Sequence, residues 1–404
     1  MAIVNETLIP LMKKDNKLFE TIFNRIAFGG SYYKGTKYGS PNEFDLYLVH
    51  KLDHWSIDLV IDTNHNKVGY VKIKINYRGG RDPNCLRYKE ELKKITDSND
   101  YLDQNKFRSW LESVIMSAFN TLRRGPSGYE LYHGGRTYYM RHKKSGPAFT
   151  IMIGKPNGDD VFDVDLVPCI EFNGVQLSSG YKRYNEDKRP FRVVPKPLYG
   201  SIWNDNLLWR LSFSENEKAM LNKSGAVKSI IKLMKKFRDT HDLKSIVSYY
   251  METIFFHELE NHKKDLDQFV RGSKTWLFMH GLRKLKEALE KEKLPFFWHS
   301  GLNLFEKMSS ATMQNHANRI RNIIDEIDDK MDSDQLILAR KILTAHESNY
   351  LIRANFRVVY QNYNNRYYNR RRKDDNEFNN MILVFFIILI IWMLNQDQST
   401  SSTT

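Results

Sequence analysis

The pattern of hydrophobic residues changes near residue 197, and this change constrains the fold more than any other feature. Before it, the alternation typical of β-strands recurs in 43–49, 54–61, 68–75, 148–153 and 161–167. After it, apolar residues recur at helical spacing through 203–223, 227–240, 243–262, 275–292 and 303–329. The sequence therefore predicts an α+β, bilobal protein with a mixed α/β lobe (1–196) and a helical lobe (197–345).

Two helices are expected within the mixed lobe. Apolar residues recur near the helical spacing over residues 5–28, which predicts one long N-terminal helix. The second helix covers residues 104–122 and ends before the pair Gly125-Pro126. The turn sequence at 156–159 predicts that the strands on either side of it pair with each other.

The end of the chain differs from both lobes. Residues 346–380 are rich in Asn, Tyr and Arg and are expected to form a flexible linker. The apolar run 381–394 would span about 21 Å as a helix, short of the roughly 30 Å of a bilayer core. A basic run at 370–373 precedes it, and a polar tail, 395–404, follows it. The run is a candidate membrane anchor, and a buried or interfacial segment is the alternative.

Charge and cysteine content restrict the partners and the compartment. The 404 residues carry a net charge of +14, which favours nucleic acid, nucleotides or an anionic membrane surface. Two cysteines, Cys85 and Cys169, exclude a disulfide-stapled secreted domain and argue against a cysteine-rich zinc site. The N-terminus shows no signal-peptide pattern, so a cytoplasmic location is expected.

Paired carboxylates on strands carry the chemistry. Glu43 and Asp45 lie two residues apart on a predicted strand, so both project from one face. A divalent cation relieves the repulsion between them, and oxygen ligands suit Mg²⁺. Gly30-Ser31 offers backbone N–H groups and a hydroxyl that can cradle a triphosphate. The strand with Asp163 and Asp165 supplies a third ligand; the alternative is that these carboxylates face solvent.

These motifs, in this order along the chain, resemble cGAS-like receptors of the insect type, which are nucleotidyltransferases related to oligoadenylate synthetases. The matching strings are Gly30-Ser31-Tyr32-Tyr33, Ser40 to Asp45, Val164 to Pro168, Trp209 to Ser214 and Lys232 to Lys235. The resemblance implies a nucleotidyltransferase sheet joined to a helical lobe, with the active site in the cleft between them.

The resemblance also implies a role for each matched residue. Glu43, Asp45 and Asp165 would bind two Mg²⁺ ions, for which Mn²⁺ can substitute, and Asp165 would help activate the attacking hydroxyl. Asp163, which does not directly precede Leu-Val-Pro, is the less favoured ligand. The predicted nucleotide-binding residues are Gly30, Ser31, Arg210, Ser212, Ser214, Lys235 and Tyr249, of which Arg210, Ser212 and Ser214 are assigned to the helical lobe. Lys235 would contact phosphate and Tyr249 would stack on a base, although Tyr249 packing in the core is the alternative.

One departure from animal cGAS concerns the activator. Residues 214–234 contain no cysteine, so the zinc-binding module used on double-stranded DNA is missing and no structural zinc is expected. This favours double-stranded RNA, which is recognised by shape, phosphate and 2′-OH contacts. The candidate RNA-binding residues are Lys13, Lys14 and Lys17 on the N-terminal helix and Lys228, Lys232 and Lys236 on one face of a second helix. A solvated helix face is the alternative.

The predicted function is therefore an RNA-activated synthase. It would convert ATP and GTP into a cyclic dinucleotide of the cyclic GMP-AMP type, which a STING-type receptor reads in antiviral innate immunity. An oligoadenylate-synthetase-like enzyme with linear products is the first alternative. A non-catalytic RNA- or nucleotide-binding family member is the second.

Overall fold

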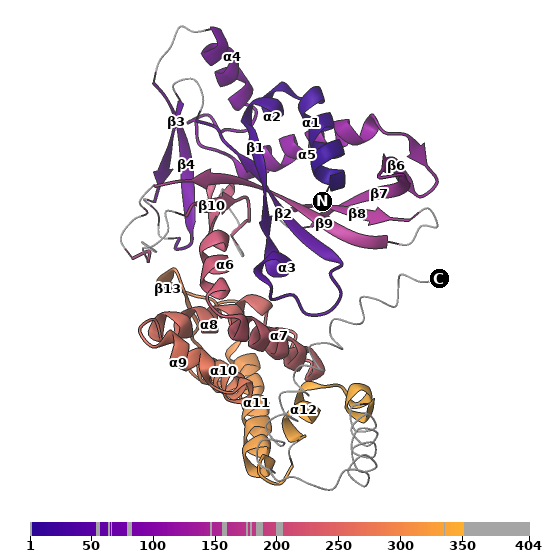
Figure 1. The fold of residues 1–404 in the computed structure, drawn as a ribbon. Coiled ribbons are helices and arrows are strands. Elements are labelled where there is room, and N and C mark those ends of the chain that lie inside the picture. Colours follow the sequence, from indigo (N-terminus) through magenta and orange to yellow (C-terminus); the bar gives the residue numbers. More distant parts are fainter. Residues whose placement is uncertain are drawn as a thin grey trace. The chain divides into compact units, whose positions relative to one another are not determined.

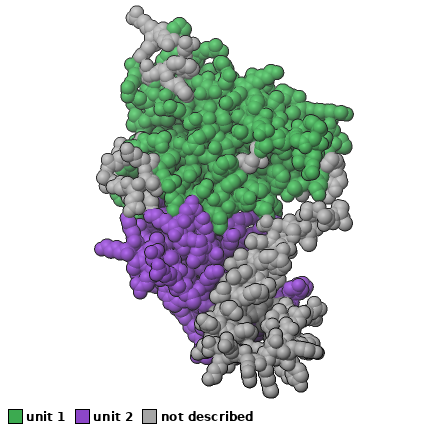
Figure 2. All heavy atoms as spheres, in the orientation of Figure 1, with its two compact units in different colours: residues 1–35, 41–219 green, residues 36–40, 220–404 purple. Residues whose placement is uncertain are grey.

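The computed structural model describes residues 2–350 apart from 54–56, 64, 66, 79–82, 146–147, 156–159, 175–176, 178–179, 183–188, 199–204 and 335. The chain divides into two units, shown in green and purple in Figure 2. Unit 1 comprises residues 1–35 and 41–219, and unit 2 comprises residues 36–40 and 220–404. The predicted anchor 381–394 and the polar tail lie outside the described residues, as does most of the linker. Among the residues that the structure describes, no helix is both long and apolar enough to cross a membrane.

Unit 1 is built on a mixed β-sheet (Figure 1). Over the described residues its strands are β1 Phe23–Gly29, β2 Glu43–His50, β3 Ile57–Asp62, β4 Tyr70–Tyr77, β5 Arg124–Gly125, β6 Gly128–His133, β7 Arg136–Ser145, β8 Ala148–Gly154, β9 Asp160–Phe172, β10 Phe191–Val194 and β11 Trp209–Ser212. Their order is β3-β4-β11-β10-β9-β8-β7-β6-β5, and β2 pairs with both β1 and β9. The predicted pairing of 148–153 with 161–167 is confirmed by the antiparallel β8–β9 ladder.

Unit 1 also contains helices. They are η1 Ile3–Leu8, α1 Ile9–Asp15, α2 Lys17–Ile22, α3 Gly30–Lys34, α4 Pro83–Leu92, α5 Gln104–Asn120, η2 Asp205–Leu207 and α6 Ser214–Asn222. The Asp103 side chain caps α5 by accepting from the backbone N–H groups of Asn105 and Lys106. Rings of Phe107 and Trp110 on α5 meet His50 of β2. At His50, the α5 side of the sheet is therefore buried. This burial lowers the pKa of His50 to about 4.

Two predicted helices are wrong in part. The N-terminal helical region ends at Ile22, and Phe23–Gly29 forms β1, because pairing with β2 overrides a local pattern that suits either structure. Within 203–223, Trp209–Ser212 is a strand between β10 and β4. Because β11 completes the sheet, unit 1 continues to residue 219, beyond the expected limit at 196.

A buried arginine ties β9, β10 and α6 together within unit 1. Arg192 on β10 is 1 % exposed. Its guanidinium donates to Glu171 at 3.0 Å, to Glu215 at 3.0 Å and to the Ser214 hydroxyl at 3.2 Å. It also lies 5.2 Å from the ring centroid of Tyr47 on β2. The side chain is desolvated but fully surrounded by partners, as a buried charge requires.

Unit 2 is helical, as predicted, apart from one small hairpin. Its elements are α7 Gly225–Thr240, α8 Ser248–Asn261, α9 Leu266–Arg271, α10 Lys274–Glu290, α11 Ser310–Lys330 and α12 Ile337–Ile342, with β12 Pro295–Phe296 paired to β13 His299–Asn303. Gly281 lets α7, α8 and α10 approach closely, since a Cβ there would lie 2.8 Å from Met234 Sδ and 2.9 Å from Phe255 Cζ. The core of this unit therefore lies among these three helices.

A short segment from the first part of the chain belongs to unit 2. Residues 36–40 follow α3 and precede β2, yet they pack with the helices. Lys235 of α7 donates to the Thr36 carbonyl at 3.0 Å and to Glu252 at 3.0 Å, and Glu252 accepts from the Thr36 hydroxyl at 2.9 Å. The ammonium of Lys236 lies 5.8 Å from the ring centroid of Tyr38.

The Arg192 network predicts that two arginines that bond the same carboxylate contribute different amounts to the free energy of unfolding. Arg192→Met should lower the free energy of unfolding by about 3 kcal/mol, because it leaves buried acceptors without their guanidinium. Arg25→Met removes the half-exposed guanidinium that bonds Glu171 at 2.8 Å and should cost less than about 1 kcal/mol. Urea denaturation measures both values, and equal losses would contradict this description of the network.

Candidate active site

Two neighbouring parallel strands bring four carboxylates together. β2 pairs with β9 so that Glu43 lies opposite Asp163 and Asp45 lies opposite Asp165. Because side chains alternate along a strand, all four project from the same face, opposite to the α5 side. The entry to β2 is fixed by the Asp163 backbone N–H, which donates to the Asn42 carbonyl at 2.8 Å. The structure thus places the three predicted metal ligands on one face of adjacent strands, with Asp163 beside them, and their binding of a metal stays a prediction.

The electrostatics of Asp165 reflect this crowding. Partial burial raises the pKa of its carboxyl, and the charges of Glu43 and Asp163 raise it further. Two groups act in the other direction: the Thr150 hydroxyl, which donates to Asp165 Oδ1 at 2.5 Å, and the ammonium of Lys143. Sequence reasoning missed Thr150, although a lone hydroxyl in the apolar stretch 148–153 was a visible signal.

The Gly30-Ser31 segment lies directly against these carboxylates. Gly29 ends β1 opposite Asp45, and Gly30 then adopts a φ of +70°, a conformation that favours glycine. A Cβ on Gly30 would lie only 1.6 Å from Asp45 Oδ2, and one on Gly29 would lie 2.3 Å from Tyr47 Cε2. The backbone therefore approaches the β2 side chains more closely than any other residue type would allow.

The next residues anchor this segment to unit 1. Ser31 is the second residue of α3, and the helix ends at Gly35 in the left-handed conformation. Lys34 of α3 is buried and donates to Glu217 of α6 at 2.6 Å. This buried ion pair ties α3, and with it the glycine-serine segment, to α6.

The donor set fits Mg²⁺, although it is not a closed cage. A divalent cation relieves the repulsion between neighbouring carboxylates, such as the charges of Glu43 and Asp163 that raise the pKa of Asp165. Within the described residues, no three Asp, Glu, His or Cys side chains converge closely enough to hold a metal by themselves. Paired carboxylates are compatible with Mg²⁺, which proteins usually bind through one or two carboxylates together with substrate phosphates.

The predicted residues of the 209–214 block lie in unit 1, not in the helical lobe as expected, because β11 is part of the sheet. Ser212 and Ser214 hydrogen-bond to the Tyr47 hydroxyl, and Ser214 also accepts from Arg192. The guanidinium of Arg210 lies 5.1 Å from the ring centroid of Tyr70. Nucleotide contacts of these residues stay predictions; sequence reasoning missed Tyr47 and Arg192, which hold the two serines.

Lys235 and Tyr249 both belong to unit 2. Lys235 is 3 % exposed and is bonded to Thr36 and Glu252, so contact with a phosphate would require these bonds to open. Tyr249 at the start of α8 is partly exposed, with its ring centroid 6.5 Å from that of Phe296. The phosphate contact of Lys235 and the base stacking of Tyr249 stay predictions.

The predicted RNA-binding lysines do not form two uniform faces. On α7, Lys228 and Lys232 are half-buried, but Lys236 is 5 % exposed and pairs with Glu347 at 2.6 Å. The expectation of one exposed face thus fails at Lys236, because a spacing of four residues drifts around a helix with 3.6 residues per turn. Burial, and then the charge of Lys228, lower the pKa of Lys232.

The lysines near the N-terminus lie in the helical region that ends at Ile22. Lys13 lies 5.1 Å from the ring centroid of Phe23, Lys14 is exposed, and Lys17 pairs with Glu20 at 2.6 Å. An exposed pair of this kind contributes little to stability, so Lys17 can exchange its partner for a phosphate.

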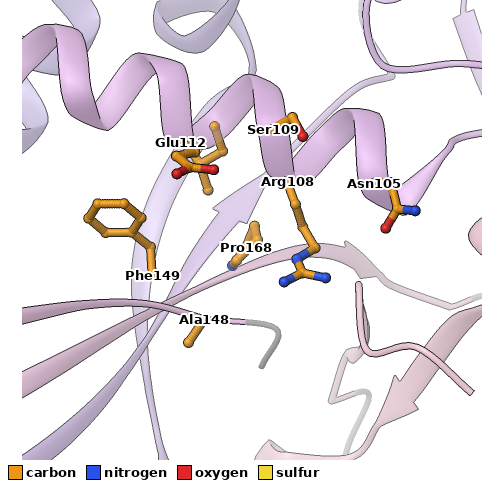
Figure 3. Close-up of a pocket in the computed structure, with 8 residues that line it drawn as sticks. Asn105, Arg108, Ser109, Glu112, Ala148, Phe149 and Pro168 are labelled. Atoms are coloured by element: carbon orange, nitrogen blue, oxygen red, sulfur yellow. The ribbon is translucent and has the colours of Figure 1, made fainter. Parts of the chain in front are cut away.

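One pocket of unit 1 is separate from the carboxylates. It has a volume of about 380 Å³ and is lined by Asn105, Arg108, Glu112, Phe149 and Pro168, among others. Figure 3 shows Arg108 of α5 extending towards the strands near Pro168. Pro168 is three residues from Asp165 on the same strand, so it faces the other side of the sheet. We therefore assign the candidate active site to the carboxylate face.

The close approach of Gly30 to Asp45 predicts a strong effect of one methyl group. Gly30→Ala should lower the rate of pyrophosphate release from nucleotides about a hundredfold, because its Cβ displaces a carboxylate that must be accurately placed. Gly134→Ala is the matched control: φ is +57°, and no atom lies within 4 Å of the added Cβ. Both variants carry similar backbone strain, so equal activities would contradict the assignment.

Comparisons with known proteins identify the family of the chain. A family model described as the Mab-21 protein nucleotidyltransferase domain matches residues 32–223, and the Mab-21 protein HhH/H2TH-like domain matches residues 226–322. The chain is 40% identical over 353 residues to a cyclic GMP-AMP synthase-like receptor of Trichogramma pretiosum, covering 87% of this chain and 72% of that protein.

Proteins of the same description from two other insects are also similar. The receptor of Aethina tumida is 33% identical over 346 residues, and that of Tribolium castaneum is 33% identical over 351 residues; in both cases 85% of each chain is covered. Since these matches extend over both units, the chain belongs to the family of cyclic GMP-AMP synthase-like receptors, with a Mab-21 nucleotidyltransferase domain followed by a Mab-21 helical domain.

Proposed function

We propose that this nucleotidyltransferase joins ATP and GTP into a cyclic dinucleotide of the cyclic GMP-AMP type. One observation carries the proposal: the parallel register of β2 and β9 sets Asp45 beside Asp165, and Gly30 touches Asp45. A triphosphate cradle next to paired carboxylates is the arrangement that nucleotidyl transfer needs. The names of the insect relatives support the cyclic product.

Each residue has a distinct task in this reaction. Gly30 and Ser31 hold the donor triphosphate with backbone N–H groups and a hydroxyl. Glu43, Asp45 and Asp165 would hold two Mg²⁺ ions, or Mn²⁺, which supply charge neutralisation at the attacking and leaving oxygens. Asp165, whose pKa is raised by burial, accepts the proton of the attacking ribose hydroxyl. Thr150 keeps the Asp165 carboxylate oriented.

The proposed activator is double-stranded RNA. No cysteine lies between Phe213 and Lys235 to hold a zinc module against a DNA groove. Burial, and then the charge of Lys228, lower the pKa of Lys232, and a bound polyanion would relieve this cost. The product would be read by a STING-type receptor in innate immunity, and the two free, buried cysteines suit a cytosolic site of action.

Two other functions are weaker. A linear product, as in oligoadenylate synthetases, requires the same carboxylates, so only identification of the product separates it from a cyclic one. A purely binding family member would not need Gly30 pressed against Asp45, and the intact carboxylate set therefore argues against it.

The reaction itself is the first test. The protein with all four nucleoside triphosphates, Mg²⁺ and duplex RNA should yield a cyclic dinucleotide, identified by mass, whereas duplex DNA should bind but stimulate little. Asp165→Asn should lower the rate at least about a hundredfold, because it removes a metal ligand without changing shape. Asp58→Asn, on β3, is the matched control. A linear product, or equal stimulation by DNA, would contradict the proposal.

The RNA surface is tested separately. Lys228→Glu combined with Lys232→Glu should raise the RNA concentration for half-maximal activity about tenfold and lower the salt slope of binding by about one per lost contact. The control exchanges the same charges on exposed lysines of unit 2, Lys291→Glu with Lys330→Glu. Unchanged RNA affinity across a salt series would show that Lys228 and Lys232 are only solvated.

A further inference from the structure

We propose that Lys143 on β7 binds the 5′-polyphosphate of the acceptor nucleotide, on the side of the carboxylates opposite to the donor cradle. This inference rests on the proposed nucleotidyl transfer and adds a subsite to it. The residue is not part of any motif in the sequence; its place follows from the register of the sheet.

The register places Lys143 in line with the reacting groups. Directly paired residues run across five strands in the order Gly29, Asp45, Asp165, Thr150 and Lys143. Directly paired residues of neighbouring strands point to the same face, so Lys143 shares the carboxylate face. The carboxylates therefore lie between Gly29, which ends β1 directly before the glycine-serine segment, and the ammonium on β7.

Contacts confirm that the ammonium reaches the carboxylates. Lys143 Nζ lies 3.1 Å from Asp163 Oδ2, and the two side chains are 52% and 31% exposed. The charge of Lys143 also acts on Asp165, whose pKa it lowers. An ion pair this exposed contributes at most about 1 kcal/mol, so a ligand with several negative charges competes with it easily.

In-line displacement decides which nucleotide meets Lys143. The attacking and leaving oxygens lie on opposite sides of the transferred phosphorus. The leaving pyrophosphate belongs to the donor triphosphate held at Gly30 and Ser31, so the acceptor approaches from the other side, towards β8 and β7. Arg141, two residues before Lys143 on the same face, extends the positive charge in that direction.

Neutralisation of Asp163 is a simpler role for Lys143 than phosphate binding. Lys143 could serve only to neutralise Asp163, and its removal would then disturb the carboxylates whatever the acceptor carries. Asp163→Asn separates the two roles, since it removes the charge that Lys143 would be neutralising. If Lys143 binds phosphate, its removal weakens acceptor binding equally whether or not Asp163 is charged.

The kinetic experiment compares two acceptors with the same base, one with a 5′-triphosphate and one with a 5′-hydroxyl. Lys143→Gln should raise KM for the triphosphate acceptor about tenfold, the loss expected for one charge-assisted contact. It should leave KM for the hydroxyl acceptor, and kcat for both acceptors, within about twofold of the wild-type values. Adding Asp163→Asn should not restore KM. The control Arg136→Gln, exposed on the same strand but on the opposite face, should match the wild type.

Equal losses for both acceptors, or restoration by Asp163→Asn, would overturn the proposal. Calorimetric binding of the triphosphate acceptor gives a readout without turnover: Lys143→Gln should weaken Kd about tenfold, and an unchanged Kd overturns the proposal. If the wild type forms no product with either acceptor, the proposed nucleotidyl transfer fails, and the binding comparison still decides the role of Lys143.

Discussion

The parallel pairing of β2 with β9 is the interaction on which the rest of the site depends. It aligns Asp45 with Asp165 over a sequence separation of more than a hundred residues, with the two strands about 4.8 Å apart. A slip of one residue would turn one pair of carboxylates to the α5 side, where His50 meets the rings of Phe107 and Trp110. The apolar residues on that side therefore fix the register, and the fixed register places the acids.

Much of the site could be predicted from the sequence because its signals are local. Two acids at alternate positions of a strand share a face wherever the strand is placed, which is why Glu43 and Asp45 were identified without a structure. The long helices had equally local signals: helical periodicity over 104–122, 227–240 and 275–292 corresponds to α5, α7 and α10.

The remaining features depend on partners that no local pattern contains. The residues of β1 suit a helix or a strand, and only the ladder with β2 decides between them. Similarly, Trp209–Ser212 is too short to show the alternation of a strand. Only its pairing with β10 and β4 in the folded protein makes it a strand. The roles of Thr150 and Lys143 follow from register across three strands, which the sequence does not reveal. The partner of Lys236 was equally invisible, since Glu347 comes from more than a hundred residues away, although the drift of its spacing around the helix is a local signal.

The short segment 36–40 has a mechanical consequence. Its backbone is held by Lys235 of α7, the helix that also carries Lys228 and Lys232. One end of the segment leads back through α3 to Gly30, and the other leads through two residues to Glu43. If RNA binds α7 as proposed, a displacement of this helix would act through the covalent chain on both the Gly30-Ser31 segment and β2. Segment 36–40 would then couple a movement of α7 to the spacing between Gly30-Ser31 and Glu43.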